Sequence, residues 1–85
     1  MTQCVDQKYK YYLFDLGYEI KRSALGARQE KANANENSED RQFQSGRLMA
    51  YYEVVSLMQQ QAAGFDIPLT DIRLDDIEPD RDLIR

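Results

Sequence analysis

The sequence of 85 residues contains no histidine, and this absence removes several classes of site at once. Ser-His-Asp triads, Cys-His pairs, histidine zinc sites and the Glu-x-x-His ligands of di-iron bundles all require an imidazole. The single cysteine, Cys4, excludes an intrachain disulfide and a two-cysteine zinc or redox pair, and we interpret it as an incidental thiol. We therefore predict no catalytic residue, no metal ligand and no cofactor, in a reducing, cytoplasmic setting.

Long apolar runs are missing as well. No stretch approaches the ~20 apolar residues that span a bilayer, and residues 1–7 lack a basic segment followed by an apolar run, so neither membrane insertion nor export is expected. Only four glycines and two prolines occur, and 42% hydrophobic with 31% charged residues is typical of a helical globular protein. The length allows one small domain over residues 1–85 and little room for a substrate cleft, which favours a non-enzymatic protein.

The negative charge is concentrated at one end. Residues 66–85 carry seven acidic side chains and three arginines, whereas residues 1–65 are balanced. Binding to nucleic acid depends on Lys and Arg that displace condensed counterions, so an acidic chain is a poor default binder. The acidic side chains between residues 71 and 82 lack the spacing and the glycine of an EF-hand, and we interpret them as a solvated surface.

A first helix is predicted over about residues 5–31, and its apolar side chains fall on two opposite faces at helical spacing. One stripe comprises Val5, Tyr9, Tyr12, Leu13, Leu16, Ile20, Ala24 and Ala27, and the other comprises Tyr11, Phe14, Tyr18 and Leu25. Gly17 and Gly26 each weaken the helix by up to ~1 kcal/mol relative to Ala. A small residue also allows a neighbour to approach closely, although simple tolerance is the favoured interpretation at Gly26.

Residues 32–38 are predicted to form a turn, because they contain three Asn and no large apolar side chain. Asn37 or Ser38 then caps a second helix over about residues 39–63, which ends at Gly64 as a left-handed residue, with Phe65 folding back over apolar surface. The centre of its apolar arc comprises Phe43, Ala50, Val54, Leu57, Met58 and Phe65, with Tyr51, Val55 and Ala62 on one flank and Met49 and Tyr52 away from the centre.

The tail, residues 66–85, matches neither a clean strand nor a long helix. Pro68 suits the first turn of a short helix, and Pro79 ends any regular element before it. Ile67, Leu69, Ile72, Leu74 and Ile77 are expected to dock as a strap, in cis or across a dimer. The order of residues 80–85 stays open, since chain ends fray while Leu83 and Ile84 offer apolar surface to bury.

These elements predict an all-α fold, a long antiparallel helical hairpin with a C-terminal strap or short helix. Because a lone hairpin has no interior and both helices carry surplus apolar surface, we expect two copies to form a four-helix bundle. The expected interface comprises Tyr11, Phe14, Tyr18 and Leu25 of the first helix and Arg47, Met49 and Tyr52 of the second. Arg47 lies inside the apolar arc and needs a carboxylate partner, unless its stem extends to the bundle end; the candidates are Asp15, Glu19 and Glu53 of either chain.

The function hypothesis is a self-associating protein that acts through protein–protein contact as an adaptor, regulator or inhibitor. The alternative is a small RNA- or DNA-binding hairpin dimer, in which Lys10, Lys21 and Arg28 lie beside the stripe that contains Tyr11, Phe14 and Tyr18. Helical-hairpin dimers of the Rop type bind RNA in this way, but the comparison with them is an analogy of fold alone. The run Ser45–Glu53, followed by Ile67–Leu69, resembles a small bacterial family, and this resemblance implies no functional residue.

Overall fold

The computed structural model describes the backbone of residues 2–84 and the side chains of residues 7–84, so the side chains of Cys4 and Val5 lie outside the described residues. Two long helices, α1 (Thr2–Asn33) and α2 (Glu39–Gly64), are followed by a 3-10 helix, η1 (Leu69–Ile72), and a single π-helical turn, η2 (Asp80–Ile84). Residues 2–84 contain no strand. The predicted all-α hairpin with a short helix in its tail is confirmed.

The turn between the helices is closed by Ser38 rather than by Asn37. The Ser38 hydroxyl accepts a hydrogen bond from the Arg41 amide at 3.0 Å and donates one to the Asn35 carbonyl at 2.6 Å. Asn37 adopts a left-handed backbone with φ 63°, which asparagine tolerates well. Glu39 and Asp40 occupy the first turn of α2, where negative charge stabilises the positive end of the helix dipole.

The second helix ends within one residue of the predicted position, but Gly64 is not the left-handed residue that follows it. Gly64 is the last helical residue, and the left-handed residue that reverses the chain is Asp66, with φ 57°. The amide of Ile67 donates to the Ala62 carbonyl at 2.8 Å and so satisfies one of the free carbonyls at the helix end. Phe65 does not fold back over apolar surface, because 73% of it is exposed.

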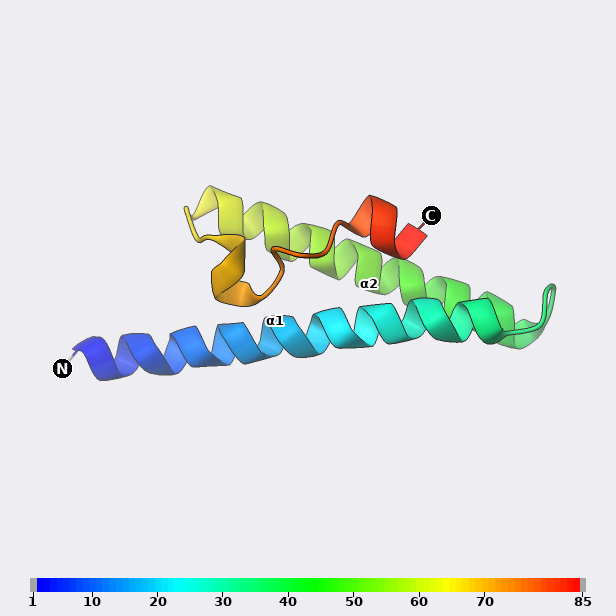
Figure 1. The fold of residues 1–85 in the computed structure, drawn as a ribbon, viewed down its shortest axis with the longest axis horizontal. Helices are drawn as coiled ribbons and strands as arrows, with labels where there is room; N and C mark the ends of the chain where they lie inside the picture. Colours follow the sequence, from blue (N-terminus) through cyan, green and yellow to red (C-terminus); the bar gives the residue numbers. More distant parts are fainter. Residues whose placement is uncertain (1, 85) are drawn as a thin grey trace.

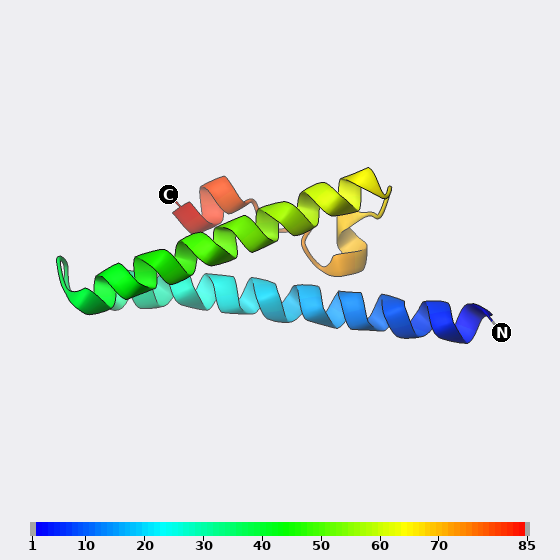
Figure 2. The same ribbon diagram turned by 180° about the vertical axis from the view of Figure 1, so that it is seen from behind.

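The two helices diverge from the turn, and the tail fills the space between them. In Figures 1 and 2, η1 lies between α1 and the last turns of α2, and η2 lies against the middle of α2. Both η1 and η2 contact both helices. The tail therefore docks in cis, and it works as a wedge between the helices rather than as a strap across a finished hairpin.

The core confirms this arrangement. It consists of Ala24 and Ala27 from α1, of Leu48, Val55 and Ala62 from α2, and of Ile72, Leu74, Ile77 and Leu83 from the tail. Leu74 and Leu83 are the largest of the fully buried side chains together with Val55. The π-helical turn directs Leu83 into the core, where it is 1% exposed, whereas the neighbouring side chain of Ile84 is exposed to solvent. Burial of Leu83 thus anchors residues 80–84 to the core.

The molecule is elongated, with extents of 55 × 20 × 16 Å and a radius of gyration of 15.1 Å. A compact domain of this length has a radius of gyration of about 12 Å. The N-terminal end of α1 extends past the tail and the end of α2 (Figure 1). Tyr9 and Tyr12, which belong to the first of the two predicted stripes, are exposed for this reason, whereas Ala24 and Ala27 of the same stripe are fully buried.

Candidate interaction surfaces

One face of α1 receives the tail through residues that follow each other at helical spacing. A Cβ atom placed on Gly17 would lie 2.8 Å from the carbonyl carbon of Ile72 and closer still to its oxygen, so the tail backbone rests directly on this glycine. The Arg73 guanidinium stacks over the rings of Phe14 and Tyr18, at 4.7 Å from each centroid. The close approach predicted for Gly17 is confirmed, with the tail as the neighbour.

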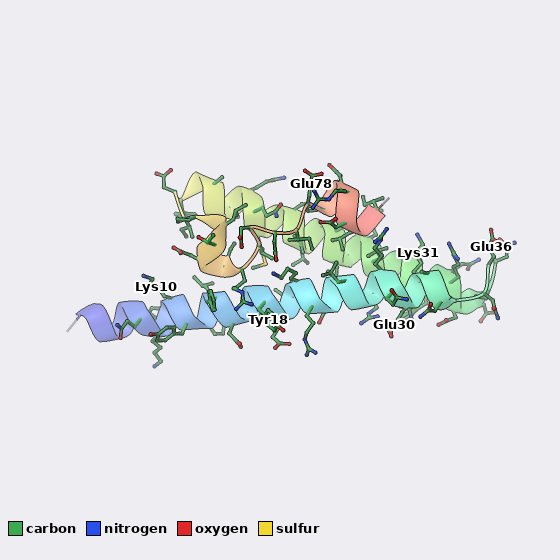
Figure 3. The ribbon with its side chains drawn as sticks, viewed as in Figure 1. Lys10, Tyr18, Glu30, Lys31, Glu36 and Glu78 are labelled. Atoms are coloured by element: carbon green, nitrogen blue, oxygen red, sulfur yellow. The ribbon has the colours of Figure 1, made fainter. Side chains whose placement is uncertain are left out.

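The same face of α1 carries the basic residues of the nucleic-acid alternative. The Lys21 ammonium donates to Asp76 at 2.7 Å, and the Lys21 side chain is only 12% exposed. This hydrogen bond is the main reason why the pKa of Asp76 is lowered. Arg28 adds to the positive field around Asp82. Lys10 is exposed on the part of α1 that extends past the tail (Figure 3).

The acidic tail thus meets the basic row of α1. Two of the three cations that could serve a nucleic acid are engaged with tail carboxylates or lie in their field. A phosphate backbone would have to compete with Asp76 for Lys21. Asp76 and Asp82 are the acidic side chains of the tail that complement cations of α1 in this geometry.

On the other helix, Tyr52 and Gln59 hold the tail by hydrogen bonds. The Tyr52 hydroxyl donates to Asp80 at 2.7 Å, and this bond raises the pKa of Tyr52. The Gln59 amide donates to the carbonyls of Leu74 at 3.1 Å and Ile77 at 2.9 Å. Sequence reasoning missed Gln59, although it follows Leu48 and Val55 at helical spacing and so lies near the buried face of α2. Tyr52, expected at the dimer interface, thus contacts the tail of its own chain in this structure.

Arg47 is paired within its own chain. Its guanidinium donates to Glu30 of α1 and, at 3.2 Å, to Gln44, and it lies 5.7 Å from the centroid of the Tyr51 ring. The expected partners Asp15, Glu19 and Glu53 were wrong. The choice of partner depends on how the two helices are aligned lengthwise, and in this alignment Glu30 faces Arg47.

The second stripe of α1 is only partly covered. Tyr11 is 68% exposed, and Leu25 is exposed as well, whereas the rings of Phe14 and Tyr18 carry the Arg73 guanidinium on one side. The tail therefore places a cation on this stripe and leaves its two ends open. Figure 3 shows Tyr18 among the side chains of this part of α1.

Most of the centre of the predicted arc on α2 faces outward, which the sequence did not indicate, whereas Met58 packs against the core. Phe43 is 67% exposed and Leu57 is 56% exposed, and Ala50 and Val54 between them are exposed too. The flank with Val55 and Ala62 faces the core instead, because the tail docks against the side of α2 that carries Tyr52 and Gln59. Phe43, Ala50, Val54 and Leu57 are called the outer stripe of α2 below. Met49 is exposed on another side.

An apolar hollow lies where the helices diverge. It has a volume of about 170 Å³ and is lined by Leu13 of α1, by Met58, Gln61, Ala62 and Phe65 of the α2 end, and by Ile67 and Ile72 of the tail. Because almost all of the lining side chains are apolar and the hollow is open, it can hold an apolar side chain of another molecule.

Two further properties concern the part of the chain that the structure describes. No helix within it is both long enough and apolar enough to cross a membrane. No group of three or more cysteine or acidic side chains within residues 7–84 is arranged to hold a metal ion.

Comparison with protein-family models, with curated proteins and with solved structures found no match. The resemblance of the run Ser45–Glu53 to a bacterial family has no support from these comparisons.

Proposed function

We propose that this chain is a non-enzymatic, self-associating helical hairpin that acts by protein–protein contact in a reducing, cytoplasmic setting. The observation that carries the proposal is the exposure of large apolar side chains on both helices after the tail has docked. They include Tyr9, Tyr11, Tyr12, Phe43, Leu57 and Phe65. Exposed apolar patches larger than a few hundred Å² usually mark an interface, and we interpret the exposed side chains on each helix in this way.

The total surface area supports the same proposal. The chain exposes 6303 Å², whereas a compact monomer of its 10.0 kDa mass exposes about 5,200 Å². Packing two hairpins side by side into a four-helix bundle buries the additional exposed area, because helical hairpins with short loops present long faces to one another.

Protein is favoured over nucleic acid as the partner. The acidic tail neutralises part of the basic row of α1, and the exposed side chains are mostly apolar and aromatic rather than cationic. The ends of the α1 stripe, Tyr11 and Leu25, together with Met49, are the predicted interface residues that stay available to a further protein.

Sedimentation equilibrium over a wide range of protein concentrations tests self-association. The expected result is a species of about twice the 10.0 kDa chain mass that dissociates on dilution, as a symmetric dimer does. A monomer at every concentration up to the millimolar range would contradict the proposal. Retention on mixed DNA and RNA at low salt, abolished by moderate salt, would favour the nucleic-acid alternative.

A further inference from the structure

We infer that the outer stripe of α2, Phe43, Ala50, Val54 and Leu57, is the seam along which a second copy of this chain docks. The inference rests on the proposed self-association and specifies its surface. It differs from the interface expected from the sequence, which combined four residues of α1 with three residues on another part of α2, namely Tyr11, Phe14, Tyr18, Leu25, Arg47, Met49 and Tyr52. The structure separates the two faces, because one of them carries part of the tail and the other is open.

The open area is large enough for a dimer. Phe43 is 67% exposed, Leu57 56% and Phe65 73%, and Val54 is exposed beside them. With an aromatic side chain presenting ~200 Å², Phe43, Val54 and Leu57 of the stripe together with Phe65 beyond its end offer on the order of 500 Å² of apolar surface per chain. Two copies then remove on the order of 1,000 Å² of apolar surface from water, and with a polar rim the total lies within the range of stable dimers.

The pattern of side-chain sizes suits a contact of α2 with itself. Phe43 and Leu57 each lie seven residues from Ala50, so the stripe has a large side chain at either end and a small one in the middle. An antiparallel copy related by a two-fold axis at Ala50 sets Phe43 against Leu57 of the partner on both sides of the axis. A symmetric interface requires such self-complementarity.

The helix backbone is also accessible at the proposed axis. Gly46 lies one turn before Ala50, and a Cβ placed on Gly46 has nothing within 4 Å. The partner backbone can approach closely there while the larger residues interdigitate beside it.

Charge favours the α2 stripe over the α1 stripe for contact between identical chains. The four stripe residues are uncharged, and Arg47 beside them is held by Glu30 of its own chain. On α1 the rings of Phe14 and Tyr18 carry Arg73. Two copies meeting through α1 would bring two Arg73 guanidinium groups together, which costs free energy, whereas the guanidinium near the α2 stripe, Arg47, is already paired with Glu30.

The test compares two matched pairs of substitutions by sedimentation equilibrium, with circular dichroism as the check on folding. The double variant Phe43→Gln, Leu57→Gln alters two exposed residues of the seam, and Tyr11→Gln, Leu25→Gln alters two exposed residues of α1. Each substitution occurs twice in a symmetric dimer, so the α2 variant should associate at least about 100-fold more weakly while staying helical. The α1 variant should associate as the wild type does.

The outcomes separate the seam from the proposed function. A wild-type dimer that the α2 pair dissociates and the α1 pair spares supports the seam. A dimer that survives the α2 pair overturns the seam and leaves self-association standing, and a wild-type chain that is monomeric at every concentration overturns both.

Cysteine crosslinking tests the axis directly. In the Cys4→Ser background, Ala50→Cys should give a rapid disulfide-linked dimer on oxidation, and Leu25→Cys should not. Fast crosslinking at position 25 and none at position 50 overturns the seam.

Discussion

The backbone carbonyl of Ile72 occupies the space that a side chain on Gly17 would need. Gly17 lies in the middle of a long helix, where glycine is unfavourable, yet it is buried because the tail backbone lies against it. The helix gives up some intrinsic stability at this point and gains a docking place for η1. The tail can therefore insert between α1 and α2 without pushing them further apart.

Replacing this glycine should loosen the tail. Gly17→Ala improves helix propensity by up to ~1 kcal/mol, but the new methyl group overlaps the Ile72 carbonyl, and relief requires movement of the backbone. We expect the free energy of unfolding to fall by about 1–3 kcal/mol in urea titrations followed by circular dichroism. Gly26→Ala is the matched control: its Cβ meets nothing within 4 Å, so it should stabilise by ~0.5–1 kcal/mol. Equal gains at both positions would contradict the close packing at Gly17.

The stacking of Arg73 on Phe14 and Tyr18 should contribute measurably to tail docking. Arg73 has a left-handed backbone with φ 59°, so the substitution must tolerate that conformation. Arg73→Asn does so and removes the cation, and we expect a loss of about 1 kcal/mol of unfolding free energy. In a Phe14→Ala background the same change should cost less, because one ring contact is already gone. Additive losses in this double-mutant cycle would show that the contact between Arg73 and Phe14 contributes nothing.

The helical hairpin follows from local features of the sequence. The long helical periodicities, the Asn-rich turn and the cap at Ser38 predict two helices whose ends agree with α1 and α2 to within three residues. Each of these signals acts over a few residues, so the chain around it is enough to interpret it.

The side of α2 that faces the core does not follow from the sequence. Val55 and Ala62 on one flank and Phe43 and Leu57 at the centre are all apolar, so periodicity alone favours no side. Contacts made by the tail decide it, through the hydrogen bonds of Gln59 to the Leu74 and Ile77 carbonyls. Arg47 pairs with Glu30 for a similar reason, since the lengthwise alignment of the helices selects the partner. Both outcomes depend on residues distant in the sequence.

The hydrogen bond from Tyr52 to Asp80 predicts one tyrosine that titrates late. A hydroxyl that donates to a carboxylate resists ionisation, and the pKa of Tyr52 is raised for this reason. The stability from this bond is present below the ordinary tyrosine pKa and is lost as the pH rises through the raised value. In an absorbance titration at alkaline pH, one of the six tyrosines should ionise after the others. Asp80→Asn should bring that tyrosine back toward the rest, and an unchanged curve would contradict the bond.

Acid should release the end of the tail, because Asp82 is held there in its charged form. Arg81 donates to both oxygens of Asp82 at 2.8 Å, and the Glu78 amide donates to Oδ2 at 2.8 Å. Chiefly through the Arg81 contact, these bonds lower the pKa of Asp82 to about 2. A free aspartate has a pKa of about 3.9. The stabilisation is therefore complete above pH ~4 and is lost as the pH falls from there toward 2.

Asp76 acts in the same direction through Lys21, which lowers the pKa of Asp76. The midpoint of thermal unfolding should thus hold steady from neutral pH down to about 5 and then fall toward pH 2. Asp82→Asn keeps an oxygen for the Glu78 amide but carries no charge, so its midpoint should start lower than that of the wild type at neutral pH and decline less between pH 4 and pH 2. If the variant and the wild type lose stability in parallel over that interval, the carboxylate of Asp82 does not hold η2 in place, and the burial of Leu83 alone orders the end of the tail.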